Sequence, residues 1–211
     1  MLNGKKIALG VTGGIAVYKA VDLVSRLRKQ GAEVRVIMTE HAQQFVTPLT
    51  FKEISGNKVA VSMWDSNQEF NVEHIALANW ADAFVVAPAT ANILAKMANG
   101  IADDLLSTTL LAAQAPIIVC PAMNTGMYQN SITQENIEKL QKHGVTVMPP
   151  AVGYLACGVT GPGRLPEPQQ IVEFIDAFFA KKDGDMVGMK VLVTAAGTRE
   201  PIDPVRFVGN R

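Results

Sequence analysis

Residues 6–21, which read KIALGVTGGIAVYKAV, decide the fold of the chain. The apolar stretch over residues 5–11 predicts a β-strand, and a turn with two adjacent glycines follows it. Residues 15–30 then carry apolar side chains at helical spacing, and Gly31 marks the end of the predicted helix. A strand, a glycine turn and a helix in this order are typical of the first unit of a parallel sheet.

The same alternation of short apolar runs and helical stretches continues along the chain, which predicts parallel strands joined by helices. The expected fold is α/β: a Rossmann-like (flavodoxin-like) parallel sheet flanked by helices, in three αβα layers. Further strands are expected over residues 33–38, 83–87, 116–120 and 145–148, with an edge strand over 58–63. Further helices are expected over residues 48–54, 91–98, 104–113, 132–143 and 171–181.

Residues 149–168 interrupt this pattern with five prolines and four glycines. Such a composition predicts a long loop, and long loops in compact domains are usually lids, binding loops or disordered segments. Residues 1–180 are therefore expected to form one domain and residues 181–189 a polar linker. A strand expected over residues 190–194 would open a second domain, which residues 190–211 are too short to complete.

The composition excludes several classes of protein. Hydrophobic residues make up 48% of the 211 residues and charged residues 18%, as in globular proteins. Lysine plus arginine and aspartate plus glutamate number 19 each, so no basic field exists to attract nucleic acid or an anionic membrane. Two widely separated cysteines, no secretory signal and no membrane-spanning apolar run favour a soluble, reduced, cytoplasmic protein.

The turn over residues 10–15 has the features of an anion site. Gly13 and Gly14 let the backbone approach a ligand closely, and the helix start that follows offers N–H groups. The spacing matches neither the dinucleotide pattern G-x-G-x-x-G nor a P-loop. A single phosphate, as in a mononucleotide, fits better, and a turn without a ligand is the alternative.

Polar residues also follow two later strands. In an open parallel sheet, ligands lie beyond the carboxyl ends of the strands, where these segments emerge. Thr90 and Asn92 follow the strand over 83–87 and suit a planar ring or a ribityl chain, although Thr90 can equally cap a helix. Asn124 follows the strand over 116–120 and can hold a carboxylate or carbonyl, or stabilise a local turn.

Two side chains have the chemistry of proton transfer. His74 lies at the start of an expected helix, where a surface or capping role is the alternative. Cys157 lies in the proline- and glycine-rich loop, whereas Cys120 lies inside an apolar strand, the usual place of a free cysteine. Because histidine is mostly neutral and cysteine mostly a thiol at neutral pH, His74 suits a base and Cys157 an acid.

Five short motifs carry a resemblance to a known family. They are GGIA at residues 13–16 with Tyr18-Lys19, the His74 segment, APATAN at 87–92, PAMN at 121–124 with Met127, and ACG at 156–158 with GPGR at 161–164. In this order they resemble the FMN-containing cysteine decarboxylases over about residues 4–180, most of all those that act on phosphopantothenoylcysteine.

The resemblance implies bound FMN, no metal, and a homo-oligomer (a trimer, which can build a dodecamer) with FMN between subunits. It implies His74 as the base, Asn124 as the carboxylate clamp and Cys157 as the acid on a flap. Asn124, Met127, Ala156 and Cys157 are the implied substrate contacts. The implied FMN contacts are Thr12, Gly13, Gly14, Ile15, Thr39, Pro88, Ala89, Thr90, Asn92, Ser107 and Thr108, the last two with helix capping as their alternative.

Residues 194–206, TAAGTREPIDPVR, resemble the opening of a phosphopantothenoylcysteine synthetase domain, which favours coenzyme A biosynthesis. The implied reaction decarboxylates 4'-phosphopantothenoylcysteine to 4'-phosphopantetheine through a thioaldehyde and an enethiolate, and no ligase activity is expected. The alternatives are a peptidyl-cysteine decarboxylase, a flavin prenyltransferase, and a regulatory subunit of the same fold without catalysis.

Overall fold

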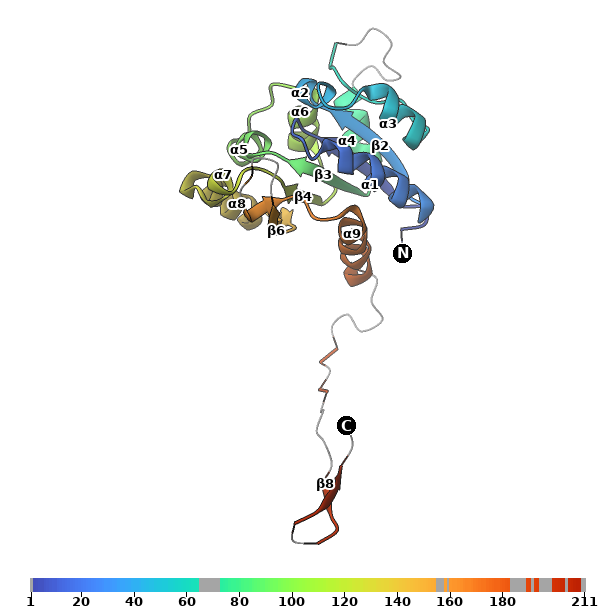
Figure 1. Ribbon diagram of the computed structural model, residues 1–211. Helices are drawn as coiled ribbons and strands as arrows, with labels where there is room; N and C mark the ends of the chain where they lie inside the picture. Colours follow the sequence, from blue (N-terminus) through green and yellow to red (C-terminus); the bar gives the residue numbers. More distant parts are fainter. Residues whose placement is uncertain are drawn as a thin grey trace. The chain divides into compact units, whose positions relative to one another are not determined.

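The computed structural model describes residues 2–64, 73–154, 158, 160–182, 189–190, 192–193, 199–203 and 205–209. The chain divides into two compact units, Met1–Phe179 and Ala180–Arg211. The first contains a five-stranded parallel sheet with helices on both faces (Figure 1). The second contains an antiparallel pair, β8 (Arg199–Pro201) and β9 (Phe207–Gly209). Among the described residues, no helix combines the length and apolar character needed to cross a bilayer.

The strands of the parallel sheet lie in the order β2-β1-β3-β4-β5. They are β1 (Lys6–Val11), β2 (Glu33–Met38), β3 (Ala83–Ala89), β4 (Ile117–Pro121) and β5 (Thr146–Val147). Every residue of β3 is buried, which explains its uninterrupted apolar sequence. From β1 the chain moves to β2 on one side and then to β3 on the other, and ligands of open α/β sheets bind at such reversals of strand order.

Alternate residues of each strand face opposite layers of helices. On β1, Ile7 and Leu9 belong to one hydrophobic core and Ala8 to the other. The first core includes residues of α1 (Val17–Lys29), α3 (Pro48–Ser55) and α9 (Pro168–Lys182). The second includes residues of α4 (Glu73–Trp80), α5 (Ala91–Asn99), α6 (Leu105–Ala112) and α8 (Ser131–Lys142). Two short helices, α2 (Glu40–Gln43) and α7 (Thr125–Gln129), follow β2 and β4. The three-layer fold expected from the sequence is confirmed.

The edge strand expected over residues 58–63 is wrong. Within that stretch Ala60 makes a single bridge to Ile37 and no strand forms. The side chain of Asn57 explains the difference, because its Nδ2 donates to the Val34 carbonyl at 2.9 Å. A side chain thus occupies the acceptor on the edge of β2 that a longer strand would have used.

The proline- and glycine-rich stretch is more regular than a long loop. It contains an antiparallel hairpin of β6 (Ala151–Tyr154) and β7 (Thr160–Arg164). Ala156 and Cys157 belong to its connection and lie outside the described residues. Of the strand expected over residues 190–194, residues 190, 192 and 193 are described and are not in a strand.

Candidate active site

A cavity of about 900 Å³ opens at the carboxyl edge of the sheet. Its volume is near the upper end of the range for small-molecule sites, roughly 300–1,000 Å³. The segments that follow β1, β2, β3 and β4 form its walls together with the end of β7. Its lining includes Thr12, Gly13, Gly14, Ile15, Tyr18, Lys19, Thr39, His41, Pro88, Thr90, Asn92, Lys96, Asp103, Asp104, Met123, Asn124, Met127, Arg164 and Leu165.

Most residues predicted to contact FMN line this cavity, and three do not. Ala89 is fully buried within β3, and Ser107 and Thr108 lie in the first turn of α6. The Ser107 amide donates to Asp104 Oδ1 at 2.7 Å, and the Thr108 hydroxyl donates to the Asp104 carbonyl at 2.7 Å. The first bond belongs to the capping box of α6, and the second joins the Thr108 side chain to the backbone one turn earlier.

The predicted catalytic and substrate residues are more scattered. Asn124 and Met127 line the cavity, whereas Ala156 and Cys157 lie outside the described residues. His74 is half-buried in the first turn of α4, and it is not among the described residues that line the cavity. Because α4 leads directly into β3, its first turn points toward the edge at which the strands end. His74 is therefore expected at the carboxyl edge of the sheet, and it lies outside the cavity that the described residues line.

Thr12 connects the loop after β1 to the end of β3. Its hydroxyl donates to the Pro88 carbonyl at 2.7 Å and accepts from the Thr90 amide at 3.2 Å. Thr12 is 2% exposed, so water does not compete for these bonds, and they fix two walls of the cavity relative to each other. Thr90 also caps α5 by accepting from the Ile93 amide, so its capping role and its place in the cavity coexist.

The two glycines of the turn have different neighbours. A Cβ atom at Gly13 would lie 2.5 Å from the Cβ of His41, so a side chain there would displace α2. At Gly14 the nearest atom to such a Cβ would be Thr90 Cγ2 at 3.9 Å, so this part of the backbone faces open space. An open backbone at a helix start can receive a phosphate, so the residues present fit the phosphate end of a mononucleotide.

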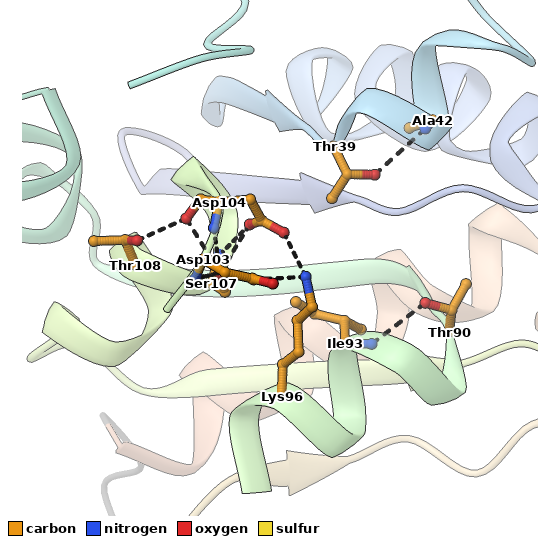
Figure 2. A network of polar contacts seen from close by, with 9 residues as sticks. All are labelled: Thr39, Ala42, Thr90, Ile93, Lys96, Asp103, Asp104, Ser107 and Thr108. Carbon is orange, nitrogen blue, oxygen red and sulfur yellow. Dashed lines mark hydrogen bonds and ion pairs between the residues drawn. The ribbon is translucent and has the colours of Figure 1, made fainter. Parts of the chain in front are cut away.

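One wall of the cavity carries an ion network between α5 and α6, and Figure 2 shows it from close by. Lys96 Nζ lies 2.6 Å from Asp103 Oδ1 and 3.0 Å from Asp104 Oδ2. Burial disfavours the ammonium charge, but the hydrogen bonds to both aspartates outweigh it and raise the pKa of Lys96. We call Lys96, Asp103 and Asp104 the helix cluster; with one ammonium and two carboxylates, its net charge is negative.

Thr39 begins α2 in the same view (Figure 2). Its hydroxyl accepts from the Ala42 amide at 3.3 Å, which caps the helix. The residue also lines the cavity. A helix start thus faces the cavity from the segment after β2, as one does from the segment after β1.

A second ion network joins α1 to the segment after β7. Lys19 Nζ donates to the Leu165 carbonyl and to Glu167 Oε1, both at 2.9 Å. Arg164 Nη2 donates to the same Glu167 oxygen at 2.7 Å. The hydrogen bond from Lys19 lowers the pKa of Glu167, and the charges of Lys19 and Arg164 add to the effect. We call Lys19, Arg164 and Glu167 the hairpin cluster; two cations and one carboxylate give it a net positive charge.

The β6–β7 hairpin lies against the segment that contains Asn124. The Met123 amide donates to the Gly163 carbonyl at 2.9 Å. Gly163 has a φ of +132°, and a Cβ atom there would overlap the Met123 carbonyl oxygen. A Cβ atom at Gly161 would lie 2.6 Å from Thr125 Oγ1. Only glycine permits this approach, so the spacing of the two glycines has a physical reason.

Asn124 begins α7 and also faces the cavity. Its Oδ1 accepts from the Gly126 amide at 2.8 Å, which fixes the orientation of the carboxamide. The NH₂ group of a carboxamide held in this way is a neutral donor, and such a group can hold a carboxylate without a full opposite charge.

Sequence reasoning missed Lys19, Lys96 and Arg164 as residues of the cavity. Lys19 precedes the buried Leu23 by four residues, and this helical spacing was the one available signal that it is buried. Its partner Glu167 is 148 residues away, so no local pattern could pair them.

Comparisons with known proteins show the family to which the chain belongs. The profile of the family described as Flavoprotein matches residues 1–180, and that of the DNA/pantothenate metabolism flavoprotein C-terminal domain matches residues 186–211. The coenzyme A biosynthesis bifunctional protein CoaBC of Haemophilus influenzae is 50% identical over 209 residues, which are 99% of this chain and 52% of that protein. The chain spans about half the length of the curated relatives it matches.

Two solved structures are similar in sequence and in fold. A PPC decarboxylase mutant complexed with pantothenoylaminoethenethiol is 32% identical with a TM-score of 0.74, over 84% of this chain and 99% of that one. The FMN-dependent cysteine decarboxylase SpaF is 31% identical with a TM-score of 0.71, over the same shares. By its sequence and by its five-stranded parallel sheet, the chain belongs to the Flavoprotein family.

Proposed function

We propose that this chain is an FMN-dependent decarboxylase that converts 4'-phosphopantothenoylcysteine to 4'-phosphopantetheine in coenzyme A biosynthesis. One observation carries the proposal: the cavity at the reversal of strand order brings together the glycine turn, the Thr90 segment and Asn124. The names of the similar proteins, a coenzyme A biosynthesis protein and a PPC decarboxylase, support the choice of substrate.

FMN would lie against the loops after β1 and β3. The open backbone at Gly14 suits its phosphate, and the polar groups of Thr90 and Asn92 suit its ribityl chain. Ile15 and Met127 are 62% and 50% exposed at the cavity, and they offer apolar surface to a planar ring. When bound, FMN supplies a two-electron oxidant that takes electrons from the substrate and later returns them.

The chemistry requires an electron sink beside the departing carboxylate. Loss of two electrons and two protons converts the substrate's CH₂–SH group to a thioaldehyde. The electrons of the carbon–carboxylate bond can then move to sulfur, which releases CO₂ and leaves an enethiolate. Uptake of one proton, followed by the return of two electrons with two protons, restores a thiol, so the whole reaction is redox-neutral and consumes one proton.

Three residues are proposed for the proton transfers and for holding the carboxylate. Asn124 would hold the carboxylate through its amide, and the place of Asn124 in the cavity supports this role. His74 would accept a proton as the substrate is oxidised, and Cys157 would donate one after CO₂ has left. Correctly placed acids and bases contribute roughly 10²–10⁴ in rate each.

A homo-oligomer, a trimer or an assembly of trimers, is part of the proposal because His74 is not among the residues that line the cavity in the part of the chain that the structure describes. A neighbouring copy packed at the mouth of the cavity would bring its own α4 toward the site. Tyr18 lines the cavity and is 59% exposed, an apolar surface that a second subunit would cover.

For the domain organisation, we propose that residues 1–180 form the FMN-binding decarboxylase domain. Residues 181–189 would be a linker, and residues 190–211 the start of a synthetase-like domain. The two family profiles, which match residues 1–180 and 186–211, support this division.

Two assays on the purified chain test the function. The protein should be yellow, and denaturation should release FMN. CO₂ should be released from 4'-phosphopantothenoylcysteine but not from a peptide that ends in cysteine. A His74→Asn variant should retain flavin and lose its substrate-dependent reduction. A colourless protein, or CO₂ from the peptide alone, would contradict the proposal.

A further inference from the structure

The hairpin cluster brings positive charge to the wall of the cavity. Lys19 is 6% exposed, and both Lys19 and Arg164 line the cavity. They share one acceptor, Glu167 Oε1, at 2.9 and 2.7 Å. The two cations share this one carboxylate, and Asp22, which also acts on Glu167, is paired with Arg26, so an anion that enters the cavity meets net positive charge here.

The Arg164 guanidinium has more N–H donors than its bond to Glu167 uses. A guanidinium has five N–H groups in a fixed fork. Within the part of the chain that the structure describes, Glu167 is the one hydrogen-bond partner of this guanidinium, through Nη2. Nη1 lies over β6, 3.4 Å from where a Cβ atom of Gly153 would be. The side chain is 43% exposed, so the remaining N–H groups can reach a ligand.

The helix cluster offers no such site. Lys96 is held between two carboxylates, at 2.6 and 3.0 Å, and the group is negative as a whole. A dianion at that wall would be repelled by the aspartates, and the hydrogen bond from Lys96 lowers the pKa of Asp103. The two clusters therefore give the cavity one wall that attracts anions and one that repels them.

The chemistry of the reaction indicates which anion belongs at the positive wall; this step rests on the proposed function. A carboxylate that must leave as CO₂ loses its charge, so a salt bridge to it would stabilise the ground state and slow the reaction. The neutral amide of Asn124 suits that group better. A phosphate keeps its charge throughout turnover, and the planar fork of arginine binds two phosphate oxygens at once.

We infer that Arg164, held in place by the Lys19–Glu167 pair, is the cavity's subsite for a phosphate monoester. Two such groups are present in the proposed reaction, the 4'-phosphate of the substrate and the phosphate of FMN. Arg164 directly follows Gly163, whose carbonyl accepts from the Met123 amide, so the subsite and the Asn124 clamp lie in neighbouring parts of the same cavity.

The test compares ligands that differ only in the phosphate. Calorimetry on the full chain with bound flavin measures the affinities of 4'-phosphopantetheine and pantetheine, and flavin fluorescence measures those of FMN and riboflavin. Arg164→Met should weaken the phosphorylated member of one pair by about tenfold to a hundredfold and leave its partner unchanged. A selective loss for 4'-phosphopantetheine would identify the substrate's phosphate as the ligand of Arg164. A selective loss for FMN would identify the phosphate of FMN instead.

Arg164→Lys keeps the charge without the fork and should give an intermediate loss. Arg26→Met is the matched control. Arg26 lies on α1, as Lys19 does, but its guanidinium donates to Asp22 and Gln169, and Arg26 is not among the described residues that line the cavity. Equal losses for both members of each pair, or no loss in either, would overturn the inference. Failure of the proposed function looks different: the wild-type chain would select for the phosphate yet release no CO₂.

Discussion

The hairpin cluster and the helix cluster line the same cavity but are held together in different ways. Lys19 and Glu167 are 148 residues apart, and their contact exists only once α1 and the segment after β7 have come together. Lys96 and Asp104 are eight residues apart, within two consecutive helices. The hairpin cluster therefore depends on the complete fold, whereas the helix cluster depends mainly on local structure.

Charge separates the two clusters as well. The hairpin cluster is positive and lies at the base of the β6–β7 hairpin, where Arg164 pairs with Ala151, and the helix cluster is negative and includes the N-cap of α6, Asp104. Similar ion pairs can therefore have different roles in one cavity. We expect binding and catalysis to be sensitive at the hairpin end, and mainly local stability to be sensitive at the helix end.

The largest effect is expected from Cys157→Ser, at the hairpin end. The variant should bind FMN and release CO₂, but it should form 4'-phosphopantetheine about 10²–10⁴-fold more slowly, because a serine hydroxyl is a far weaker acid than a thiol. Mass spectrometry of the product, with CO₂ measured in the same reaction, checks the result. An unchanged yield of 4'-phosphopantetheine would remove the proposed role of Cys157.

Gly163→Ala should have the next largest effect. Its φ of +132° is strained for alanine, and the new Cβ atom would overlap the Met123 carbonyl oxygen, so we expect a loss of about 3 kcal/mol in the free energy of unfolding. Gly144→Ala is the control, because Gly144 has a φ of +86° but open space around it. Urea unfolding measures both, and equal losses would show that the hairpin does not press against the Asn124 segment.

Lys19→Met and Lys96→Met compare the two clusters directly. Lys19→Met leaves the Leu165 carbonyl, in a residue only 2% exposed, without its donor, so we expect a loss of about 2 kcal/mol. Lys96→Met should lose less, because water can solvate Asp103, whose side chain is 57% exposed. Thermal unfolding of the two variants checks the order. A greater loss for Lys96→Met would reverse the comparison.

The smallest effect concerns pH. The pKa of Glu167 is lowered in the folded chain, so its contribution to stability is present at neutral pH and is lost as the pH falls below about 4.3, the ordinary glutamate value. Because the side chain is 53% exposed, the contribution should be under about 1 kcal/mol. Wild type and Glu167→Gln should converge in stability on acidification, and a constant difference between them would rule out the charged pair as its cause.

Much of the fold could be predicted because it depends on local patterns. The apolar runs over β1 and β3 and the glycine turn indicate a parallel sheet, and the carboxyl ends of its strands indicate where a site lies. The hairpin was missed because Gly161 and Gly163 pack closely against Thr125 and Met123, which are distant in the sequence. Ser107 illustrates the opposite case, since its sequence context allows either a cap or a ligand contact and the structure shows the cap.

We expect one cavity to hold FMN and the substrate together, so that electrons taken from the substrate return to it. Anaerobic stopped-flow mixing of the yellow protein with 4'-phosphopantothenoylcysteine, with CO₂ and flavin absorbance recorded together, tests it most directly. We expect transient bleaching of the flavin, many CO₂ molecules per flavin without an added oxidant, and full recovery of the oxidised spectrum. Permanent bleaching after one equivalent, or CO₂ release without any flavin signal, would contradict it.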